Sequence, residues 1–157
     1  MADSTELLRK ISIFGALRPD TLDELLGKAK RMEVAAGEIF MREGEPGGDL
    51  YIVESGRAEV FKERSGKGGK PVRIRLAELQ RGDCFGETSI LAIMPRCASV
   101  AAMTDCTALR LLNTDLLDLY QRDIHEFAVL ILNLGREVAR RLWVTNELLL
   151  AQLLRDV

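Results

Sequence analysis

Residues 85–100 of the chain read FGETSILAIMPRCASV, with a glycine and a glutamate ahead of a short apolar run and an arginine ten residues after the glycine. Gly86 can adopt backbone angles that other residues avoid, and it lets a ligand approach the main chain closely. If residues 88–91 start a short helix, their amide groups lack partners within the helix and form a site for an anion. Arg96 supplies the countercharge as a planar fork, which suits a phosphate.

Glu87 needs a different target, because a phosphate repels a neighbouring carboxylate. A natural target is a donor such as a sugar hydroxyl. A phosphate, a sugar hydroxyl and a nearby apolar wall together describe a nucleotide. The alternative interpretation is that Glu87 and Arg96 form an ion pair with each other in an empty site.

Length and composition place the chain among ordinary soluble proteins. Its 157 residues suffice for one domain, or one domain with an appendage, and 47% of them are hydrophobic and 29% charged. The net charge of −2 does not favour nucleic acid as a partner. Cys84, Cys97 and Cys106 form no CxxC pair, so we expect free thiols, no metal site and a reducing, cytoplasmic location. No segment has the length of a signal peptide or of a membrane span.

Glycines are concentrated in the middle of the chain, where ten of the 13 lie between Gly37 and Gly86. Short runs with strand character separate them, a pattern typical of an all-β sandwich or barrel. The expected strands cover residues 39–41, 50–54, 58–62, 72–79, 99–102 and 108–112, and residues 64–71 form a hairpin tip.

The flanks of this region have helical patterns. Residues 5–13 predict a short amphipathic helix, and Pro19 opens a second one. Asn113 or Thr114 is expected to cap a helix that runs through Tyr120. Residues 123–154 contain no proline and predict one long helix. We therefore divide the chain into residues 1–122, with the N-terminal helices and the strands, and residues 123–157, the long helix.

The long helix changes character along its length. Its first half carries one apolar stripe that is expected to cover the β-core: Phe127, Ile131, Leu134, Val138 and Leu142. The segment 143–154 leaves little polar face, and such a helix needs another surface to bury it. The economical partner is the same helix of a second copy, which predicts a homodimer through residues 134–154.

The stretch 85–100 closely resembles the phosphate-binding cassette of the cyclic nucleotide-binding domain family. The family pattern is Phe-Gly-Glu, a small or apolar stretch, then Arg-x-Ala-x-Val, and it matches here without insertion or deletion. Residues 36–38, 42–47 and 50–56 also resemble the opening strands of that family's fold. The resemblance implies a mainly β protein with flanking helices, namely a jelly-roll-like β-roll with a long C-terminal helix.

The resemblance also implies a role for individual residues. Gly86, Ser89 and Cys97 would offer main-chain amides to the cyclic phosphate, and Arg96 would pair with it. Glu87 would accept a hydrogen bond from the ribose hydroxyl. The matching cassette positions that complete the ligand-binding set are Phe85, Thr88 and Ala98.

Residues 139–147, ARRLWVTNE, are similar to the dimerisation helix of catabolite-activator-type regulators in this family. In those proteins a Thr-Ser pair contacts the adenine, and its second member reaches across the dimer. The similarity adds Arg141, Thr145 and Asn146 to the predicted ligand contacts. The alternative is that Thr145 and Asn146 are polar residues on a coiled-coil seam that set its register.

Together these features predict a cyclic nucleotide-binding regulatory module that dimerises, with no catalytic residues and no cofactor. In the family, the residue after the cassette arginine is often Ala for cAMP and Thr or Ser for cGMP. Cys97 is neither, and because a thiol is a weak donor we expect cAMP. No recognition helix follows residue 154, so DNA binding by this chain alone is not expected. The alternatives are a transcriptional regulator cut before its DNA-binding domain and a dimerisation module indifferent to ligand.

Overall fold

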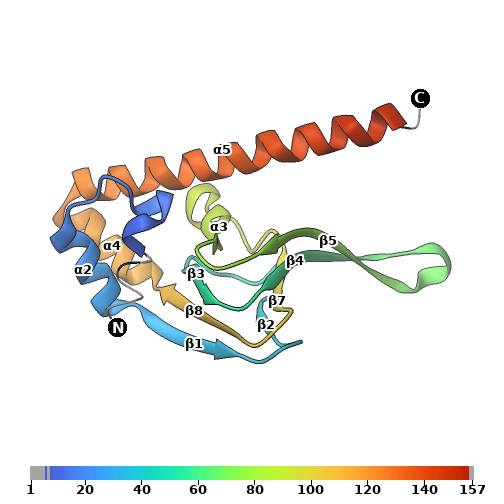
Figure 1. The fold of residues 1–157 in the computed structure, drawn as a ribbon, viewed down its shortest axis with the longest axis horizontal. Helices are drawn as coiled ribbons and strands as arrows, with labels where there is room; N and C mark the ends of the chain where they lie inside the picture. The colour runs from blue at the N-terminus through green and yellow to red at the C-terminus, as the bar shows by residue number, and fades with distance from the viewer. Residues whose placement is uncertain (1–5, 7, 156–157) are drawn as a thin grey trace.

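The computed structural model describes residue 6 and residues 8–155, and its centre is a β-roll of two four-stranded antiparallel sheets (Figure 1). One sheet has the order β1-β8-β3-β6 and the other β2-β7-β4-β5. The strands are β1 (Lys30–Val34), β2 (Ile39–Met41), β3 (Leu50–Ser55), β4 (Ala58–Ser65), β5 (Pro71–Leu79), β6 (Cys84–Phe85), β7 (Ser99–Ala102) and β8 (Cys106–Leu111). The expected β-roll is confirmed.

The interior of the roll is lined by the inward-facing residues of both sheets. In β3, Tyr51 and Val53 belong to this inner core, whereas Leu50 and Ile52 face the helices on the other side. Successive side chains of a strand point to opposite faces, so a strand with both faces covered is buried at almost every position. This explains why five of the six residues of β3 are buried.

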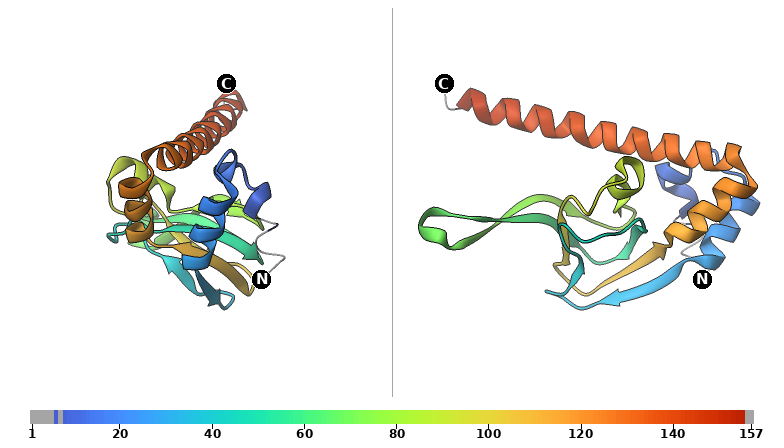
Figure 2. Two further views of the ribbon diagram at one scale, coloured as in Figure 1. Left: turned by 90° about the vertical axis from the view of Figure 1, so that its left-hand side faces the viewer. Right: turned by 180° about the vertical axis from the view of Figure 1, so that it is seen from behind.

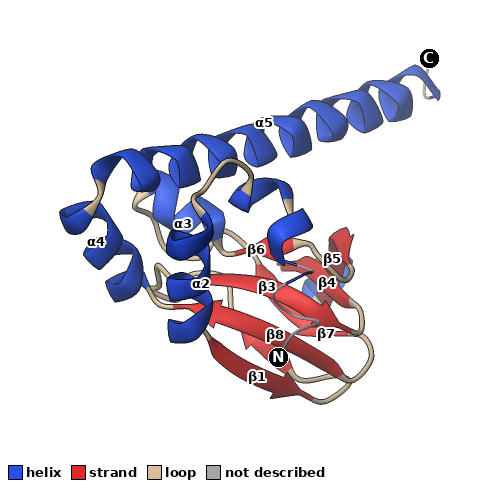
Figure 3. Ribbon diagram, turned by 60° about the vertical axis from the view of Figure 1, so that its left-hand side comes forward, coloured by secondary structure: helices blue, strands red, loops and turns tan. Residues whose placement is uncertain are grey.

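Helices cover the outer face of the sheet that contains β3. The helical elements are η1 (Ser12–Phe14), α2 (Pro19–Lys28), η2 (Lys67–Gly69), α3 (Glu87–Ala92), α4 (Asn113–Arg122) and α5 (Ile124–Arg155). Figure 3 shows α2 and α4 at one end of the strands, with α5 crossing above them. Pro19 lies in the first turn of α2, where its missing amide costs no helical hydrogen bond.

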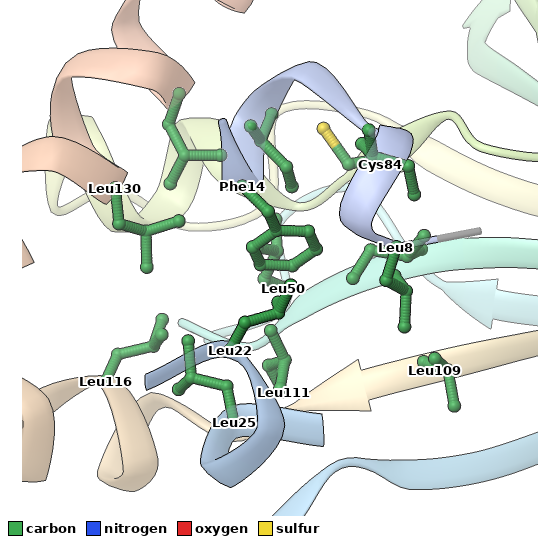
Figure 4. Packing of buried hydrophobic residues seen from close by; sticks show 14 of the residues in the cluster. Leu8, Phe14, Leu22, Leu25, Leu50, Cys84, Leu109, Leu111, Leu116 and Leu130 are labelled. Carbon is green, nitrogen blue, oxygen red and sulfur yellow. The ribbon is translucent and has the colours of Figure 1, made fainter. Parts of the chain in front are cut away.

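A second hydrophobic core joins these helices to the sheet (Figure 4). Phe14 lies near Leu50, and Leu22, Leu25, Leu116 and Leu130 approach the same region from three helices. Asn133 of α5 is also buried, and its amide donates to the carbonyl groups of Ile13 (3.1 Å) and Gly15 (2.7 Å). The first half of α5 is therefore an integral part of the domain, as its apolar stripe predicts for Phe127, Ile131 and Leu134. The prediction is wrong for Leu142, which is 59% exposed because the helix has left the domain at that point.

The second half of α5 leaves the domain. The helix has 32 residues, about 48 Å at the rise of an α-helix, and residues 142–155 are all exposed. Figures 1 and 2 show that α5 continues past α3 and extends from the domain in the same direction as the long β4–β5 hairpin. None of the helices within the described part of the chain is long and apolar enough to cross a membrane.

Several local expectations need correction. The sequence pattern missed β1 and β6, which are short or carry charged residues, and both pair with distant strands. The helix expected over residues 5–13 is interrupted at Ile11 in its described part, with residues 5 and 7 outside the description. Neither Asn113 nor Thr114 caps α4. The helix begins at Asn113, and the backbone amide of Asn113 donates instead to the Asp49 carboxylate at 2.8 Å.

Candidate functional site

The site is built around a sharp turn between β6 and α3. Gly86 at this turn has a φ of +88°, a left-handed conformation that side chains other than glycine rarely adopt. A Cβ atom at this position would lie 2.7 Å from the Asp49 carbonyl oxygen and 2.8 Å from Nη1 of Arg96. Both the backbone angle and the close approach of Arg96 thus require glycine here.

Arg96 is buried behind this turn, with only 5% of its surface exposed. Its backbone is held by two hydrogen bonds with the loop at residues 44–45, of 2.8 and 2.9 Å. Its Nη1 donates to the carbonyl oxygens of Asp49 (3.1 Å) and Gly86 (3.0 Å). Within residues 6 and 8–155, no carboxylate pairs with this guanidinium. The guanidinium also lies over the Tyr51 ring, 5.6 Å from its centre. A buried cation whose partners are neutral carbonyls and an aromatic ring is incompletely compensated, and an anion would complete it.

Glu87 is the first residue of α3 and is also buried. Its Oε1 accepts a hydrogen bond from Nη1 of Arg141 at 3.1 Å, and Arg141 also donates to the Cys84 carbonyl (2.7 Å) and to Glu137 (2.8 Å). The alternative in which Glu87 and Arg96 pair with each other is therefore wrong. The two charges face different partners, and Glu87 is linked to α5.

Burial and charge at this junction alter two pKa values. Burial opposes the charge of Arg141, but the attraction of Glu87, Cys84 and Glu137 outweighs it and raises the pKa of Arg141. Burial raises the pKa of the Cys84 thiol to about 12, in spite of the nearby Arg141. Arg141 therefore remains a firmly charged link between α5 and the cassette, and Cys84 remains a neutral thiol beneath it.

The other cassette residues have distinct surroundings. Phe85 stacks on Tyr51 inside the roll, with ring centres 4.9 Å apart, and Ala98 is buried. Thr88 is half-buried, and its Oγ1 lies 3.3 Å from Sγ of the exposed Cys97. Ser89 is buried, and its Oγ has no hydrogen-bond partner. The cassette therefore places a polar pair, Thr88 and Cys97, on its more accessible side.

Thr145 and Asn146 lie on α5 beyond Arg141, and both are exposed. The hydroxyl of Thr145 donates to the carbonyl of Arg141 at 2.9 Å, one helical turn earlier. Within a single chain these two residues are not gathered with the cassette. Arg141 is the last residue of α5 for which a hydrogen bond or an ion pair joins the helix to the roll in the described part of the chain.

Sequence reasoning missed Asp49, which organises one wall of the site. Its carboxylate accepts from Nε of Arg110 (2.7 Å) and from the amide of Asn113 (2.8 Å), while its carbonyl oxygen holds Arg96. The partners lie 47 to 64 residues away in the sequence, so no local spacing identifies them. The only local signal is an acid placed between the 44–48 turn and an apolar strand.

Replacing Asp49 by alanine is expected to lower the free energy of unfolding by about 1–2 kcal/mol, because Arg110 loses its acceptor and the first turn of α4 loses its cap. Urea denaturation of the variant would measure the change. Asp49→Asn is the matched control, since its amide oxygen can still accept from the Asn113 amide, and it should be less destabilised. Equal midpoints for the wild type and the alanine variant would contradict this role.

Cys97 is expected to be the one thiol of the three that reacts with iodoacetamide in the folded protein. Cys84 and Cys106 are buried, and the raised pKa of Cys84 keeps it protonated at neutral pH. Mass spectrometry of the native alkylated protein would locate the modification. Labelling of Cys84 at a comparable rate would show that the packing beneath Arg141 opens readily.

Comparison with known proteins gives a consistent family assignment. The family model of the cyclic nucleotide-binding domain matches residues 31–123. The cAMP-dependent protein kinase regulatory subunit of Aspergillus fumigatus is 35% identical over 104 residues, which cover 66% of this chain and 24% of that protein. The CRP-like cAMP-activated global transcriptional regulator of Mycobacterium tuberculosis is 30% identical over 152 residues, or 97% of this chain and 64% of that one.

The fold is shared with a solved bacterial structure. The catabolite activator protein of Thermus thermophilus superimposes with a TM-score of 0.71 and 33% identity, over 90% of this chain and 62% of that structure. The chain thus spans about a quarter of the length of the fungal subunit and under two thirds of each bacterial regulator.

Proposed function

The chain belongs to the cyclic nucleotide-binding domain family, and from this premise we propose that it binds a cyclic nucleotide, cAMP in preference to cGMP, as a regulatory module without catalysis. The observation that carries the proposal is Arg96, a buried guanidinium with no carboxylate partner among the described residues. A cyclic phosphate beside the Gly86 turn would supply the missing negative charge. The first amides of α3, which begins at Glu87 directly after Gly86, would add hydrogen-bond donors for that phosphate.

Glu87 supports a sugar as the second recognition element. Its carboxylate is buried and oriented by Arg141 through Oε1, which leaves further acceptor capacity on the second oxygen. A ribose hydroxyl is a donor of the right type for that oxygen. Because Arg141 neutralises the carboxylate, the repulsion between Glu87 and a bound phosphate would be reduced.

The proposed preference for cAMP over cGMP rests on the weak hydrogen-bond donors at the accessible side of the cassette. Cys97 offers a thiol, which is a poor hydrogen-bond donor, and the Thr88 hydroxyl beside it is already within 3.3 Å of that sulfur. Neither group strongly favours the additional polar atoms of guanine. The two relatives described above are named for cAMP, which agrees with this choice.

We further propose that the ligand acts on α5. Arg141 connects the helix to Glu87, and Val144 and Leu148 continue the same helical face one and two turns later, where both side chains are exposed. A base bound above the cassette would offer these residues an apolar partner. Ligand binding would then favour one position of the second half of α5, because only that position gains the contacts.

A different face of α5 fits a homodimer. Residues spaced alternately by four and three along this face form a seam whose members are not buried in this chain: Ala128, Leu132, Gly135, Ala139, Leu142, Asn146, Leu149 and Leu153. This is the spacing of a two-stranded coiled coil, in which a single polar residue such as Asn146 sets the register. A Cβ on Gly135 would meet nothing within 4 Å, so the packing of this chain does not require the glycine, whereas a closely packed second helix would.

A second candidate is the sensor portion of a transcriptional regulator. The alignment with the Mycobacterium tuberculosis regulator favours it, because 97% of this chain matches a protein that is named as one. DNA binding by the product of the full-length gene would distinguish this role from that of a stand-alone module.

Calorimetric titration of nucleotide-free protein with cAMP, cGMP and linear AMP tests the proposed function. We expect one site per chain, tighter binding of cAMP than of cGMP, and much weaker binding of AMP because its charge and shape differ from those of the cyclic phosphate. Absence of heat with either cyclic nucleotide would refute the proposal and favour a dimerisation module that is indifferent to ligand. Tighter binding of cGMP would refute only the preference.

A further inference from the structure

Strand β5 lies at one edge of its sheet, because the order β2-β7-β4-β5 gives it β4 as its single neighbour among the described strands. Of its nine residues, all but Leu79 are exposed. Figures 1 and 2 show the β4–β5 hairpin projecting beyond the rest of the roll. The outer side of an edge strand presents backbone N–H and C=O groups that no neighbouring strand pairs with. This edge of β5 is therefore available to a further strand.

Positive charge is concentrated on the same hairpin. Residues 62–76 contain six of the 22 lysines and arginines of the chain but only one of its 24 acids, Glu63. This segment has a net charge of +5, whereas the rest of the chain has a net charge of −7 and the whole chain of −2. A local positive field on a chain that is acidic elsewhere attracts a negatively charged partner to this segment.

Acids next to the hairpin neutralise part of its positive charge. Glu43 pairs with Lys62 at 3.3 Å and with Arg64 at 2.8 Å. Arg73 pairs with Glu59, also at 2.8 Å. These ion pairs account for three of the six cations, so the attraction for a partner depends on the other three.

Those three cations have a distant partner or none. Arg75 approaches Glu78 only at 3.9 Å. Lys67 and Lys70 lie at the exposed tip of the hairpin and form no ion pair within the part of the chain that the structure describes. A negatively charged partner would therefore gain attraction here without breaking a close ion pair of the protein.

The strand also carries aliphatic side chains that nothing in this chain covers. Val72 is 46% exposed and Ile74 is 47% exposed. Successive side chains of a strand point to opposite faces, so these two share one face of β5 and Arg73 and Arg75 share the other. A partner that covers both faces must therefore offer apolar groups on one side and negative charge on the other.

Three other occupants of this edge fit less well. Antiparallel pairing of two copies of β5 about Ile74 would place Arg73 of each copy opposite Arg75 of the other, and like charges in that position are destabilising. A lipid surface offers negative charge but leaves the backbone groups of the edge without hydrogen bonds. A nucleic acid offers phosphates but no aliphatic side chains for Val72 and Ile74.

We propose that β5 binds an extended acidic segment of a partner protein, which adds to the edge of the sheet as a further strand. Aspartate or glutamate side chains of the segment face Arg73 and Arg75, and the aliphatic residues that alternate with them pack on Val72 and Ile74. An acid at the end nearest the hairpin tip meets Lys70. This docking surface lies outside the proposed nucleotide site and does not depend on the proposed function.

The test is the fluorescence anisotropy of a labelled peptide, GDVEIEVDG, titrated with the nucleotide-free protein. We expect saturable binding, and at least about tenfold weaker binding of GVVIDEEDG, which has the same composition without the alternation. Two further peptides carry N-methyl groups on the valines and isoleucine or on the acidic residues, which removes the donors of one edge or of the other. Only one edge of the peptide faces β5, so one of these two should lose binding and the other should keep it.

Substitutions in β5 test the two faces separately. Ile74→Lys should weaken binding of GDVEIEVDG at least about tenfold, because the aliphatic contact is lost although positive charge is added. Leu117→Lys on α4 is its control, since the exposed fractions of the two side chains are nearly equal (47% and 48%). Arg75→Glu should weaken binding to a similar extent through repulsion, whereas Lys30→Glu, the same change in charge on β1, should not.

Several results would overturn the inference. Absence of saturable binding would exclude the docking surface, and equal binding of GVVIDEEDG would show an attraction by charge alone. Binding that survives both sets of N-methyl groups would exclude the addition of a strand. Displacement of the peptide by phosphatidylserine vesicles or by duplex DNA at equal concentration of negative charge would favour a lipid surface or a nucleic acid instead. Because the titration contains no nucleotide, its failure is distinguishable from a failure of the proposed function.

Discussion

Replacing Arg96 by alanine is expected to weaken cAMP binding by about 3 kcal/mol, or more than a hundredfold. The guanidinium is buried, so its interaction with a phosphate is poorly screened by water. The neighbouring cations Arg141 and Arg110 cannot replace it. The Arg141 guanidinium is committed to Glu87, Glu137 and the Cys84 carbonyl, and the Arg110 guanidinium is committed to the Asp49 carboxylate. Calorimetric titration with cAMP measures the loss directly.

The fold should tolerate this substitution. The carbonyls of Asp49 and Gly86 lose a donor, which costs about 1–3 kcal/mol, but an uncompensated buried charge is removed at the same time. Arg96→Lys keeps the charge and loses the fork, and should be intermediate in affinity. Arg75→Ala, at an exposed position on β5, is the control for a general loss of positive charge. Wild-type affinity in Arg96→Ala would refute the assignment of the phosphate site.

Replacing Leu149 by glutamate is expected to convert the proposed dimer to a monomer. Leu149 lies on the seam of α5, where twofold symmetry would bring two carboxylates together in an apolar interface. The loss of two buried leucines and the burial of two like charges would cost at least about 3 kcal/mol, or roughly a hundredfold in the dimer Kd. Sedimentation equilibrium over a range of protein concentrations gives the mass.

Leu148→Glu is the matched control, because Leu148 is the adjacent residue, is also an exposed leucine (67% against 53%), and lies off the seam. Its helical face is the one that carries Arg141, so we expect it to leave the dimer intact and to weaken cAMP binding instead. Dissociation of both variants to the same extent would show that the whole apolar surface of α5 forms the interface. A dimeric Leu149→Glu protein would exclude the seam.

The contrast between these two leucines shows what sequence patterns could and could not resolve. Apolar residues lie on nearly all sides of the helix predicted for residues 143–154, so the sequence predicted that the helix is buried against a partner. It did not show which face of the helix meets the roll and which meets a second copy. The structure locates Arg141 against Glu87 and the Cys84 carbonyl, and these contacts together with those of Asn133 orient the helix. Once the helix is oriented, Leu148 falls on the side of the roll and Leu149 on the outer seam.

Local patterns predicted most of the elements that surround the site. Strands β2 and β7 have the expected bounds, and β3, β4, β5 and β8 differ by a few residues at their ends. The short helix after Gly86 and the long C-terminal helix were also predicted. By contrast, β6 has only two residues, and apolar and polar residues alternate too weakly in β1 (KRMEV) for a local pattern to predict a strand. Both segments become strands through pairing, β6 with β3 and β1 with β8.

What the sequence by itself determined is the cassette: the positions of Gly86, Glu87 and Arg96, and therefore the chemistry of an anion beside a hydroxyl. These residues lie within eleven positions of one another, so turn geometry and helix-end chemistry relate them directly. The tertiary structure alone decided which partners hold them. Asp49, Arg110 and Arg141 reach the cassette from a loop, a strand and a helix that are distant in the sequence. Such contacts depend on how sheets and helices pack rather than on any local spacing.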